Sequence, residues 1–543
     1  MPVPPRHDLR HLGDFDVGPR LLAITAFALP IGALSAGVAW CLLRLIGLIT
    51  NLVFYQRFGT ALVAPGEVHH SPFLILLAPV AGGLVIGLVA RFGSEKIRGH
   101  GIPEAIESVL TSGSKIQPRV AFLKPISSAI AIGTGGPFGA EGPIIMTGGA
   151  LGSISAQFLH LSADERKTLL VSGAAAGMAA TFDAPLASVL LAVELLLFEW
   201  RPRSFIPVAA AVAVATAVRV PLLGSGPVFP TPTGALHLDA ASYGLCIVSG
   251  ALAGVLALIA TSLVYLSEDA FGRLPIHWMW WPAIGGVIIG LGGLIVPQAL
   301  GVGYDVIEAE LNGSIALDLV VGILIVKTLI WSLSLGSGTS GGVLAPVFMI
   351  GGALGALEGD LLPHVFPGFW AMAGLAAVVG GVMRSPLTGV VFTLELTHSW
   401  NALPALLLSA TAAYALSVLV LKRSVLTEKI ARRGLHLTRE YSTDPLETFF
   451  VRDVMHPIDD SAGESGRFAV RDRLTVRALA YLFAENGCTE ADVIDAENNV
   501  IGRVGIADLL QPRLHDLTEE HHRARTLFGP PSQPGDRTRA ASV

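Results

Sequence analysis

The hydrophobic residues of this chain gather in long stretches that contain no charged side chain. Six stretches are long enough, or nearly so, to cross a hydrocarbon core about 30 Å thick: Leu21–Leu43, Phe73–Ala90, Ala240–Ser267, Leu274–Tyr304, Thr328–Leu357 and Leu396–Leu421. Shorter apolar pieces such as Thr168–Phe182 and Ser204–Val218 suit partial or re-entrant helices better than full spans. The pattern predicts well over ten helical segments, many of them irregular.

The composition supports a membrane protein. Of the 543 residues, 52% are hydrophobic and 14% are charged, whereas an ordinary soluble domain has about 25% charged residues. So few charges could not cover the surface of a soluble protein of this size. The composition excludes a soluble enzyme, a disordered chain and a disulfide scaffold, and it predicts an all-α polytopic membrane protein.

The charges are unevenly distributed along the chain. Residues 1–435 carry no net charge, so the whole net charge of −6 lies in residues 436–543, which we expect to be a separate soluble unit. No segment is basic enough to indicate nucleic-acid binding. Five basic residues after the last apolar stretch favour a cytoplasmic C-terminal end, and Arg6, Arg10 and Arg20 argue more weakly for a cytoplasmic N-terminus. The alternative is that these residues only anchor helix ends at the interface.

An internal repeat is visible. Gly139–Gly152 aligns with Gly342–Gly355 at an offset of 203, sharing Gly, Pro, Met and a closing Gly-Gly-Ala-Leu-Gly. A second pair of blocks follows in the same order at an offset of 201, and it aligns Glu194 with Glu395. Repeated halves in a membrane protein predict a transporter-like fold whose site lies where the halves meet.

Three glycine-rich segments interrupt the apolar stretches: Gly99–Pro103, Gly139–Pro143 and Gly336–Pro346. Each places Gly before a Pro, and each Pro fits the first turn of a helix. A helix start offers unpaired N–H groups and a partial positive charge. Three such starts that converge would bind an anion weakly enough for rapid passage. The alternative is that the glycines only allow close helix packing.

Glu141 is the most informative single residue. It carries the only formal charge between Pro125 and Ala163, and a charge in a membrane is costly. A carboxylate at a helix start would occupy the place of an anion, compete with it and move aside when protonated. The alternative is an interfacial Glu that caps its own helix.

These segments resemble those of the CLC family of chloride channels and chloride/proton antiporters. That family carries G-S-G-I-P, G-K/R-E-G-P and G-x-F-x-P, which read here as Gly99-His-Gly-Ile-Pro103, Gly139-Ala-Glu-Gly-Pro143 and Gly342-Val-Leu-Ala-Pro346. The resemblance covers roughly residues 20–435. It implies a homodimer in the cell membrane with one anion path per subunit, built from inverted repeats with broken and re-entrant helices.

The resemblance also implies roles for single residues. Glu141 resembles the gating glutamate of the family. Lys124 resembles the basic residue that biases the path toward anions, although a snorkelling side chain is the alternative. The anion-binding positions would be His100, Gly101, Ile102, Gly142, Val343, Leu344 and Leu426.

Four positions depart from the family pattern. His100 stands where Ser is usual, which could add pH sensitivity near neutrality, and Leu344 replaces the usual Phe. Leu426 aligns with a Tyr that contacts the anion, with Thr427 as an alternative match. Leu195 stands where antiporters usually carry a second, internal glutamate, and its neighbour Glu194 matches a separate, structural acid.

These departures leave the transport mode open. We favour a channel or weakly proton-coupled conductor of chloride over a chloride/proton antiporter, and a fluoride exporter is a weaker alternative. A sensor whose membrane part only anchors the tail, and a cation or solute carrier with Glu141, Asp183 and Glu194 as ligands, are hypotheses of other classes. No motif supports an enzyme or a cofactor in the membrane part.

The tail contains segments that look like the start and end of one CBS repeat: Val451–Met455, Asp492–Gly502 and Val504–Leu510. An adenine nucleotide is a possible ligand of such a repeat, and a degenerate structural module is the alternative. The expected division is an N-terminal tail (1–20), a membrane domain (21–435, with repeats at 21–220 and 240–435), a linker (436–450), a CBS-like unit (451–512) and a disordered end (513–543).

Overall fold

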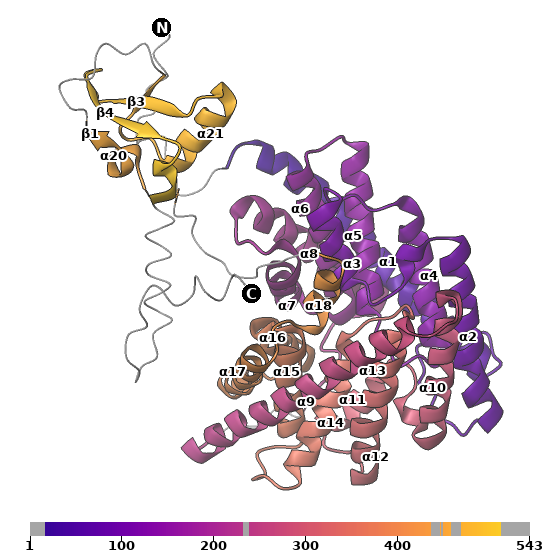
Figure 1. Ribbon diagram of the computed structural model, residues 1–543. Helices are drawn as coiled ribbons and strands as arrows, with labels where there is room; N and C mark the ends of the chain where they lie inside the picture. The colour runs from indigo at the N-terminus through magenta and orange to yellow at the C-terminus, as the bar shows by residue number, and fades with distance from the viewer. Residues whose placement is uncertain (1–16, 232–237, 436–445, 447–448, 458–467, 512–543) are drawn as a thin grey trace. The chain divides into compact units, whose positions relative to one another are not determined.

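The computed structural model describes residues 17–231, 238–435, 446, 449–457 and 468–511, and it divides the chain into two compact units (Figure 1). The first unit comprises Val17–Arg439 and is helical. The second contains the described residues after Glu440. The linker at 436–450 and the end at 513–543 lie almost wholly outside the described residues, as does most of the N-terminal tail.

The first half of the helical unit contains helices α1 to α8. Their bounds are α1 (Arg20–Phe54), α2 (Pro72–Phe92), α3 (Ile102–Thr111), α4 (Pro118–Gly133), α5 (Glu141–Phe158), α6 (Ala163–Phe182), α7 (Pro185–Leu191) and α8 (Pro202–Leu223), with a 3₁₀ turn η2 (Glu95–Ile97) and a π-helical turn η3 (Ala192–Leu197).

The second half contains α9 to α18. Their bounds are α9 (Ala240–Gly272), α10 (Trp281–Ile295), α11 (Tyr304–Leu311), α12 (Leu317–Gly322), α13 (Thr328–Gly336), α14 (Leu344–Gly359), α15 (Phe369–Met383), α16 (Pro386–Thr397), α17 (Leu403–Val420) and α18 (Val425–Arg432), with a π-helical turn η6 (Ile323–Lys327) between α12 and α13.

Seven helices or helix pairs of the described chain are long and apolar enough to cross a membrane. The first of these, α1, continues to Phe54, eleven residues beyond the end of the predicted apolar stretch. Arg44 does not end the helix, because its guanidinium donates to the Thr60 hydroxyl at 3.0 Å in the following loop. The predicted stretch Thr328–Leu357 is two helices, α13 and α14, separated at residues 337–343.

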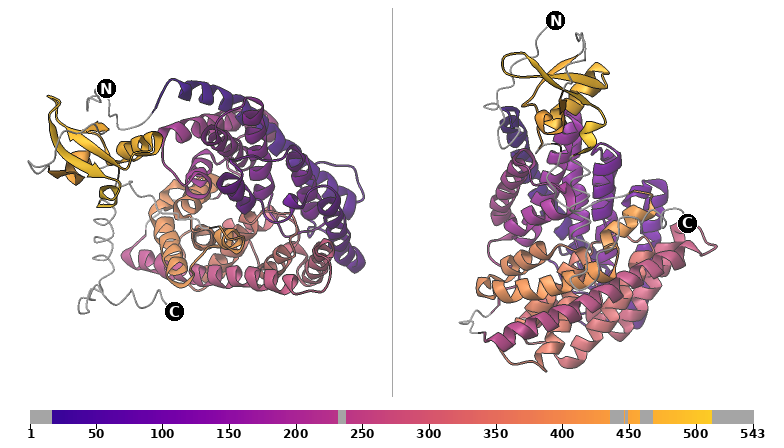
Figure 2. Two further views of the ribbon diagram at one scale, coloured as in Figure 1. Left: turned by 45° about the horizontal axis from the view of Figure 1, so that its top comes forward. Right: turned by 60° about the vertical axis from the view of Figure 1, so that its left-hand side comes forward.

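Corresponding helices of the two halves pack in the same way. α5 packs on α6 as α14 packs on α15, and α1 packs on α8 as α9 packs on α17. Across the two halves, α2 lies beside α10 and α7 lies beside α16 (Figures 1 and 2). The repeat found in the sequence therefore corresponds to a repeat of elements.

Glycines set the spacing between these helices. A Cβ on Gly152 would lie 1.9 Å from the Leu169 carbonyl oxygen of α6, and a Cβ on Gly355 would lie 1.9 Å from the Trp370 carbonyl oxygen of α15. Such distances leave no space for any side chain. The α5–α6 and α14–α15 pairs thus touch backbone to backbone at matching positions, as small residues allow in membrane proteins.

Two repeat-related acids join the halves. The Glu395 carboxylate accepts from the amides of Leu186 and Ala187 at 2.9 and 2.8 Å, at the start of α7. The Glu194 carboxylate accepts from the Thr388 amide at 3.1 Å, at the start of α16. Each half thus caps a helix of the other half, and unpaired N–H groups at two buried helix starts are satisfied.

The second unit is a small α/β module. Its sheet has the strand order β1-β4-β3-β2, with bounds β1 (His456–Pro457), β2 (Ala469–Arg471), β3 (Glu490–Ile494) and β4 (Val500–Gly505). β2 and β3 are parallel and are connected through α21 (Val476–Asn486), the crossover that a parallel pair requires. A short helix, α20 (Val451–Val454), contributes Val451 to the same core as Phe483 and Val493.

Candidate functional site

The three glycine-rich segments meet at one place in the helical unit. Gly139 and Gly342 form an isolated antiparallel bridge, in which the Gly342 amide donates to the Gly139 carbonyl at 2.8 Å. A Cβ on Gly142 would lie 1.9 Å from the His100 carbonyl oxygen and 3.1 Å from the Cα of Gly342. The starts of α3, α5 and α14 therefore converge, as predicted from the sequence.

Backbone strain marks the first of these segments. Gly99 and Gly101 have φ angles of +87° and +95°, a region that residues with a Cβ rarely adopt. A Cβ on Gly101 would in addition lie 2.4 Å from the Gly142 carbonyl oxygen. Glycine is required here for the backbone conformation and for the close approach to α5.

Glu141 is the first residue of α5 and is fully buried. Its carboxylate does more than cap its own helix, because it also accepts a hydrogen bond from another helix. Oε1 accepts from the Ala345 amide of α14 at 2.9 Å, across the junction between the two halves. Oε2 has no hydrogen-bond partner among the described residues. The acid thus occupies a position at a helix start of the opposite half where an anion would be stabilised.

Five of the seven predicted anion-binding positions lie at the three converging helix starts. Ile102, Gly142, Val343 and Leu344 are buried at the starts of α3, α5 and α14. The Gly101 amide is engaged, because it donates to the Glu104 carboxylate at 2.8 Å. Leu426 is buried in α18, which packs against α3.

His100 is 1% exposed, and its Nδ1 has no partner among the described residues. A buried imidazole with a free nitrogen stands where the resemblance expects a serine hydroxyl. The ring can present either a donor or an acceptor there, depending on its tautomer.

Lys124 is fully buried, and its ammonium group donates to the carbonyls of Ile97 and Gly99 at 2.8 and 2.6 Å. The alternative of a snorkelling side chain is wrong, because the ammonium group does not reach the surface. Lys124 instead binds the loop that leads into α3.

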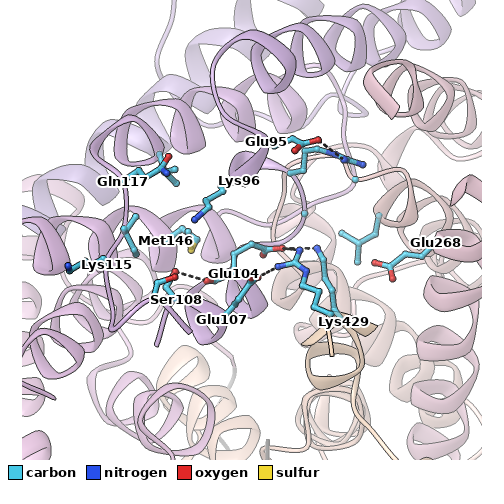
Figure 3. Close-up of a pocket in the computed structure, with 18 of the residues that line it drawn as sticks. Glu95, Lys96, Glu104, Glu107, Ser108, Lys115, Gln117, Met146, Glu268 and Lys429 are labelled. Atoms are coloured by element: carbon cyan, nitrogen blue, oxygen red, sulfur yellow. Dashed lines mark hydrogen bonds and ion pairs between the residues drawn. The ribbon is translucent and has the colours of Figure 1, made fainter. Parts of the chain in front are cut away.

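A cavity of about 460 Å³ approaches this loop, and Gly99, Glu104 and Lys429 are among the residues that line it (Figure 3). Lys429 of α18 forms an ion pair with Glu104 of α3 at 2.7 Å. Lys96 of η2 points into the cavity in Figure 3. The cavity lies beside the loop that leads into α3.

Sequence reasoning missed several charged residues around the junction. Lys327 lies 203 positions after Lys124, and its ammonium group donates to the carbonyls of Ala299 and Gly301 at 2.9 and 2.8 Å. The repeat offset alone could have identified it. The ion pair of Glu104 with Lys429 and the buried carboxyl of Glu310 left no comparable signal in the sequence.

Leu195 and Glu194 lie in the π-helical turn η3, which packs against α3 and α6. Leu195 is 1% exposed, and Glu194 caps α16 as described above. The expectation that Glu194 is a structural acid agrees with this bonding. Leu195 offers no titratable group at its position.

Residues 81–418 match the family model of the voltage gated chloride channels. The chain is 30% identical over 386 residues to a voltage-gated ClC-type chloride channel, ClcB, of Citrobacter koseri, covering 69% of this chain and 92% of the relative. It is also 30% identical over 438 residues to an H(+)/Cl(−) exchange transporter, ClcA, of Salmonella paratyphi B, covering 75% and 88%.

Solved structures show the same fold. The structure of a slow cyanobacterial Cl⁻/H⁺ antiporter superposes with a TM-score of 0.65 at 22% identity, covering 77% of this chain and 99% of that one. A eukaryotic CLC transporter superposes with a TM-score of 0.63 at 20% identity, covering 90% and 98%. The chain therefore belongs to the CLC family of voltage gated chloride channels, and it is a multi-pass integral membrane protein of chloride transport rather than an enzyme.

Proposed function

We propose that this protein conducts chloride across a membrane through the junction of α3, α5 and α14, and that Glu141 is the gate. The observation that carries the proposal is the bond from the Ala345 amide to the Glu141 carboxylate. A buried acid on the backbone donors of another helix start occupies a place that suits a small anion.

Gating then follows from competition. While Glu141 is ionised, its carboxylate and a chloride ion compete for the same N–H groups. A proton on Glu141 removes its charge and weakens its bond to α14, because hydrogen bonds to ionised groups are about twice as strong as neutral ones. The anion replaces the side chain, and transport increases as the pH falls.

We favour a channel or a weakly proton-coupled conductor. The support is Leu195, which places an apolar, fully buried side chain where coupled members usually carry a second acid. A chloride/proton antiporter is the alternative, and relatives with both descriptions are equally similar to this chain. A fluoride exporter is a weaker alternative.

The test is the reversal potential of the purified protein in a lipid bilayer under combined chloride and pH gradients. Chloride alone sets the reversal potential of a channel. A potential that moves with pH at a fixed ratio contradicts the channel and establishes the antiporter.

Glu141→Gln tests the gate itself. Charged hydrogen bonds of this kind contribute about 1.5–3 kcal/mol, so chloride efflux from liposomes at neutral pH should rise about tenfold or more. The efflux should also lose its dependence on pH. An unaltered pH response in this variant shows that Glu141 does not gate.

The same proposal includes the assembly. We propose two inverted repeats per subunit, a homodimer in the plasma membrane and both termini in the cytoplasm. Exposed leucines support a contact between subunits: Leu186 of α7 and Leu387 of α16 are 56% and 49% exposed at repeat-related positions. The second unit has the β-α-β arrangement that suits a single CBS-like unit, and an adenine nucleotide is its candidate ligand.

A further inference from the structure

Glu310, near the end of α11, is a buried acid that the proposed gate does not use. Its side chain is 1% exposed, and neither carboxyl oxygen has a hydrogen-bond partner among the described residues. A Cβ on Gly352 would lie 2.2 Å from its Oε2, so the carboxyl group lies directly against the backbone of α14.

Lys327 lies close to the same helix. A Cβ on Gly303 would lie 2.5 Å from the sulfur of Met349 and 3.6 Å from the Nζ of Lys327. The ammonium group of Lys327 and the side chain of Met349 therefore both lie close to Gly303. Because Met349 belongs to the middle of α14, Lys327 lies near the middle of that helix. It is fully buried and is held there by the carbonyls of Ala299 and Gly301.

Three residues of α14 thus lie next to three charged side chains. Ala345 bonds Glu141, Met349 neighbours Lys327 through Gly303, and Gly352 contacts Glu310. The spacing of i, i+4 and i+7 puts these positions on one face of the helix. Seven residues of α-helix span about 10 Å, so Glu310 lies about two turns from the gate with the lysine between them.

A second cavity lies beside the loop that binds Lys327. It measures about 90 Å³ and is lined by Gly301 to Asp305 and by the loop residues Leu62 to Pro65. Asp305 lines the cavity and lies within electrostatic range of Lys327. The lining includes Gly301, whose carbonyl binds the ammonium group of Lys327, so this cavity approaches Lys327 from a place other than the cavity beside Glu104.

We propose that Glu310 binds a proton exchanged through the second cavity, and that Lys327 transmits the charge of Glu310 to Glu141, so that Glu310 sets the pH at which the gate opens. This inference rests on the proposed role of Glu141 as the gate. According to this inference, Glu310 of α11 is a second group that binds a proton, besides Glu141. It lies in the half of the chain that does not contain Glu141.

The physical argument concerns the charge of Lys327. An ionised carboxylate without hydrogen bonds is costly to bury, and either a proton or a nearby cation stabilises it. While Glu310 is ionised, it neutralises much of the field of Lys327. Once Glu310 is protonated, that field acts on Glu141 and on an anion beside it, and it favours the ionised form of Glu141.

The surroundings of Glu310 make this coupling specific. Lys327 is the charged group that interacts electrostatically with Glu310 from the neighbouring elements. Lys327 in turn interacts electrostatically with Asp305, Glu310 and Glu141. Of the two helices that pack most closely on α11, α15 has no charged residue and α14 has only Glu358, whose carboxylate accepts from the Ser249 hydroxyl of α9. The Tyr304 hydroxyl of α11 has no partner among the described residues and also lies near Glu141.

The test is chloride efflux from liposomes as a function of pH for Glu310→Gln, with Glu308→Gln as the matched control. Glu308 lies on the same helix but is exposed, so its neutralisation should leave the midpoint pH unchanged. Because Glu310→Gln leaves the charge of Lys327 uncompensated near Glu141, the midpoint should shift down by about half to one pH unit.

Two further variants make the result decisive. Glu310→Met, an apolar residue of similar length, should give the same downward shift if the glutamine variant does not fold. Lys327→Gln should shift the midpoint upward. An unchanged midpoint in a folded Glu310 variant overturns this inference.

Failure of the proposed function gives a different result. If Glu141→Gln keeps its pH response, the gate itself is wrong and this inference fails with it. If Glu141→Gln loses the pH response while the Glu310 variants match the wild type, only the role of Glu310 is contradicted.

Discussion

The two halves of the helical unit share a backbone scaffold and differ in the chemistry placed on it. Lys124 and Lys327 each donate to two loop carbonyls, and the glycines beside those carbonyls have positive φ in both halves. Yet the first residue of α5 is Glu141 and the first residue of α14 is Leu344. The repeat therefore keeps the helix starts and their partial charges in both halves, whereas a single position places the proposed gate in the first half.

The buried acids differ in the same way. Glu104 of the first half is paired with Lys429 of α18 at 2.7 Å, whereas Glu310 of the second half has no bonded partner among the described residues. The counter-charge comes from α18, at the end of the second half. The buried acid of one half thus has a bonded counter-charge, and the buried acid of the other half does not.

The largest expected effect comes from making the first half resemble the second. Position 142 is Gly, whereas the repeat-related position 345 is Ala. In Gly142→Ala the new Cβ would meet the His100 carbonyl at 1.9 Å. We expect a loss of about 3 kcal/mol of unfolding free energy and of most chloride efflux, because overpacked backbone contacts cannot relax.

Gly244→Ala is the control, because no atom lies within 4 Å of a Cβ on Gly244. Thermal unfolding in detergent and efflux from liposomes measure both variants. A stable, fully active Gly142→Ala protein would contradict the close meeting of α3 and α5.

The next effect concerns the two lysines. Lys124→Met and Lys327→Met each leave two buried carbonyls without a donor, at a cost of about 2 kcal/mol or more. Both variants should lower the unfolding temperature by a similar amount, whereas Lys96→Met, at an exposed position, should not. A loss confined to one lysine variant would show that the two loops are not equivalent in energy.

A smaller effect is expected at the reciprocal caps. Glu395 accepts from two amides of α7, and loss of a helix cap costs about 1 kcal/mol. Glu395→Ala and Glu194→Ala should each lower the unfolding temperature modestly and leave the pH response of efflux intact. A changed pH response in Glu194→Ala would give that residue a part in proton transfer.

The smallest effect is expected from the second unit. Deletion of residues 440–543 should leave the chloride efflux of the membrane part unchanged within about twofold, because its site residues and both cavities lie within Val17–Arg439. Loss of efflux in a folded truncated protein would support the alternative of a sensor that depends on its tail.

The sequence was sufficient to predict the convergence of the three helix starts. Gly and Pro at fixed positions report backbone geometry, and the lone charge of Glu141 in an apolar stretch is visible without a structure. The break between α13 and α14 within Thr328–Leu357 could be predicted only in part, because a turn of Gly and Ser residues does not interrupt the hydropathy pattern.

The partners of buried charges could not be predicted. Glu141 bonds Ala345 across 204 positions, and Glu104 meets Lys429 across 325. Such contacts depend on how the helices pack, and that information lies in no local pattern. Only the repeat offset carried long-range information, and it would have located Lys327.

The bridge between Gly139 and Gly342 has a consequence for the ancestry of this architecture. The bridge takes one glycine from each half, and the amide that binds the Glu141 carboxylate belongs to the other half, so neither half alone builds this junction. A single half would therefore have to pair with a second copy to form such a junction. Two copies in one chain can differ from each other, and here they differ where Glu141 in one copy corresponds to Leu344 in the other.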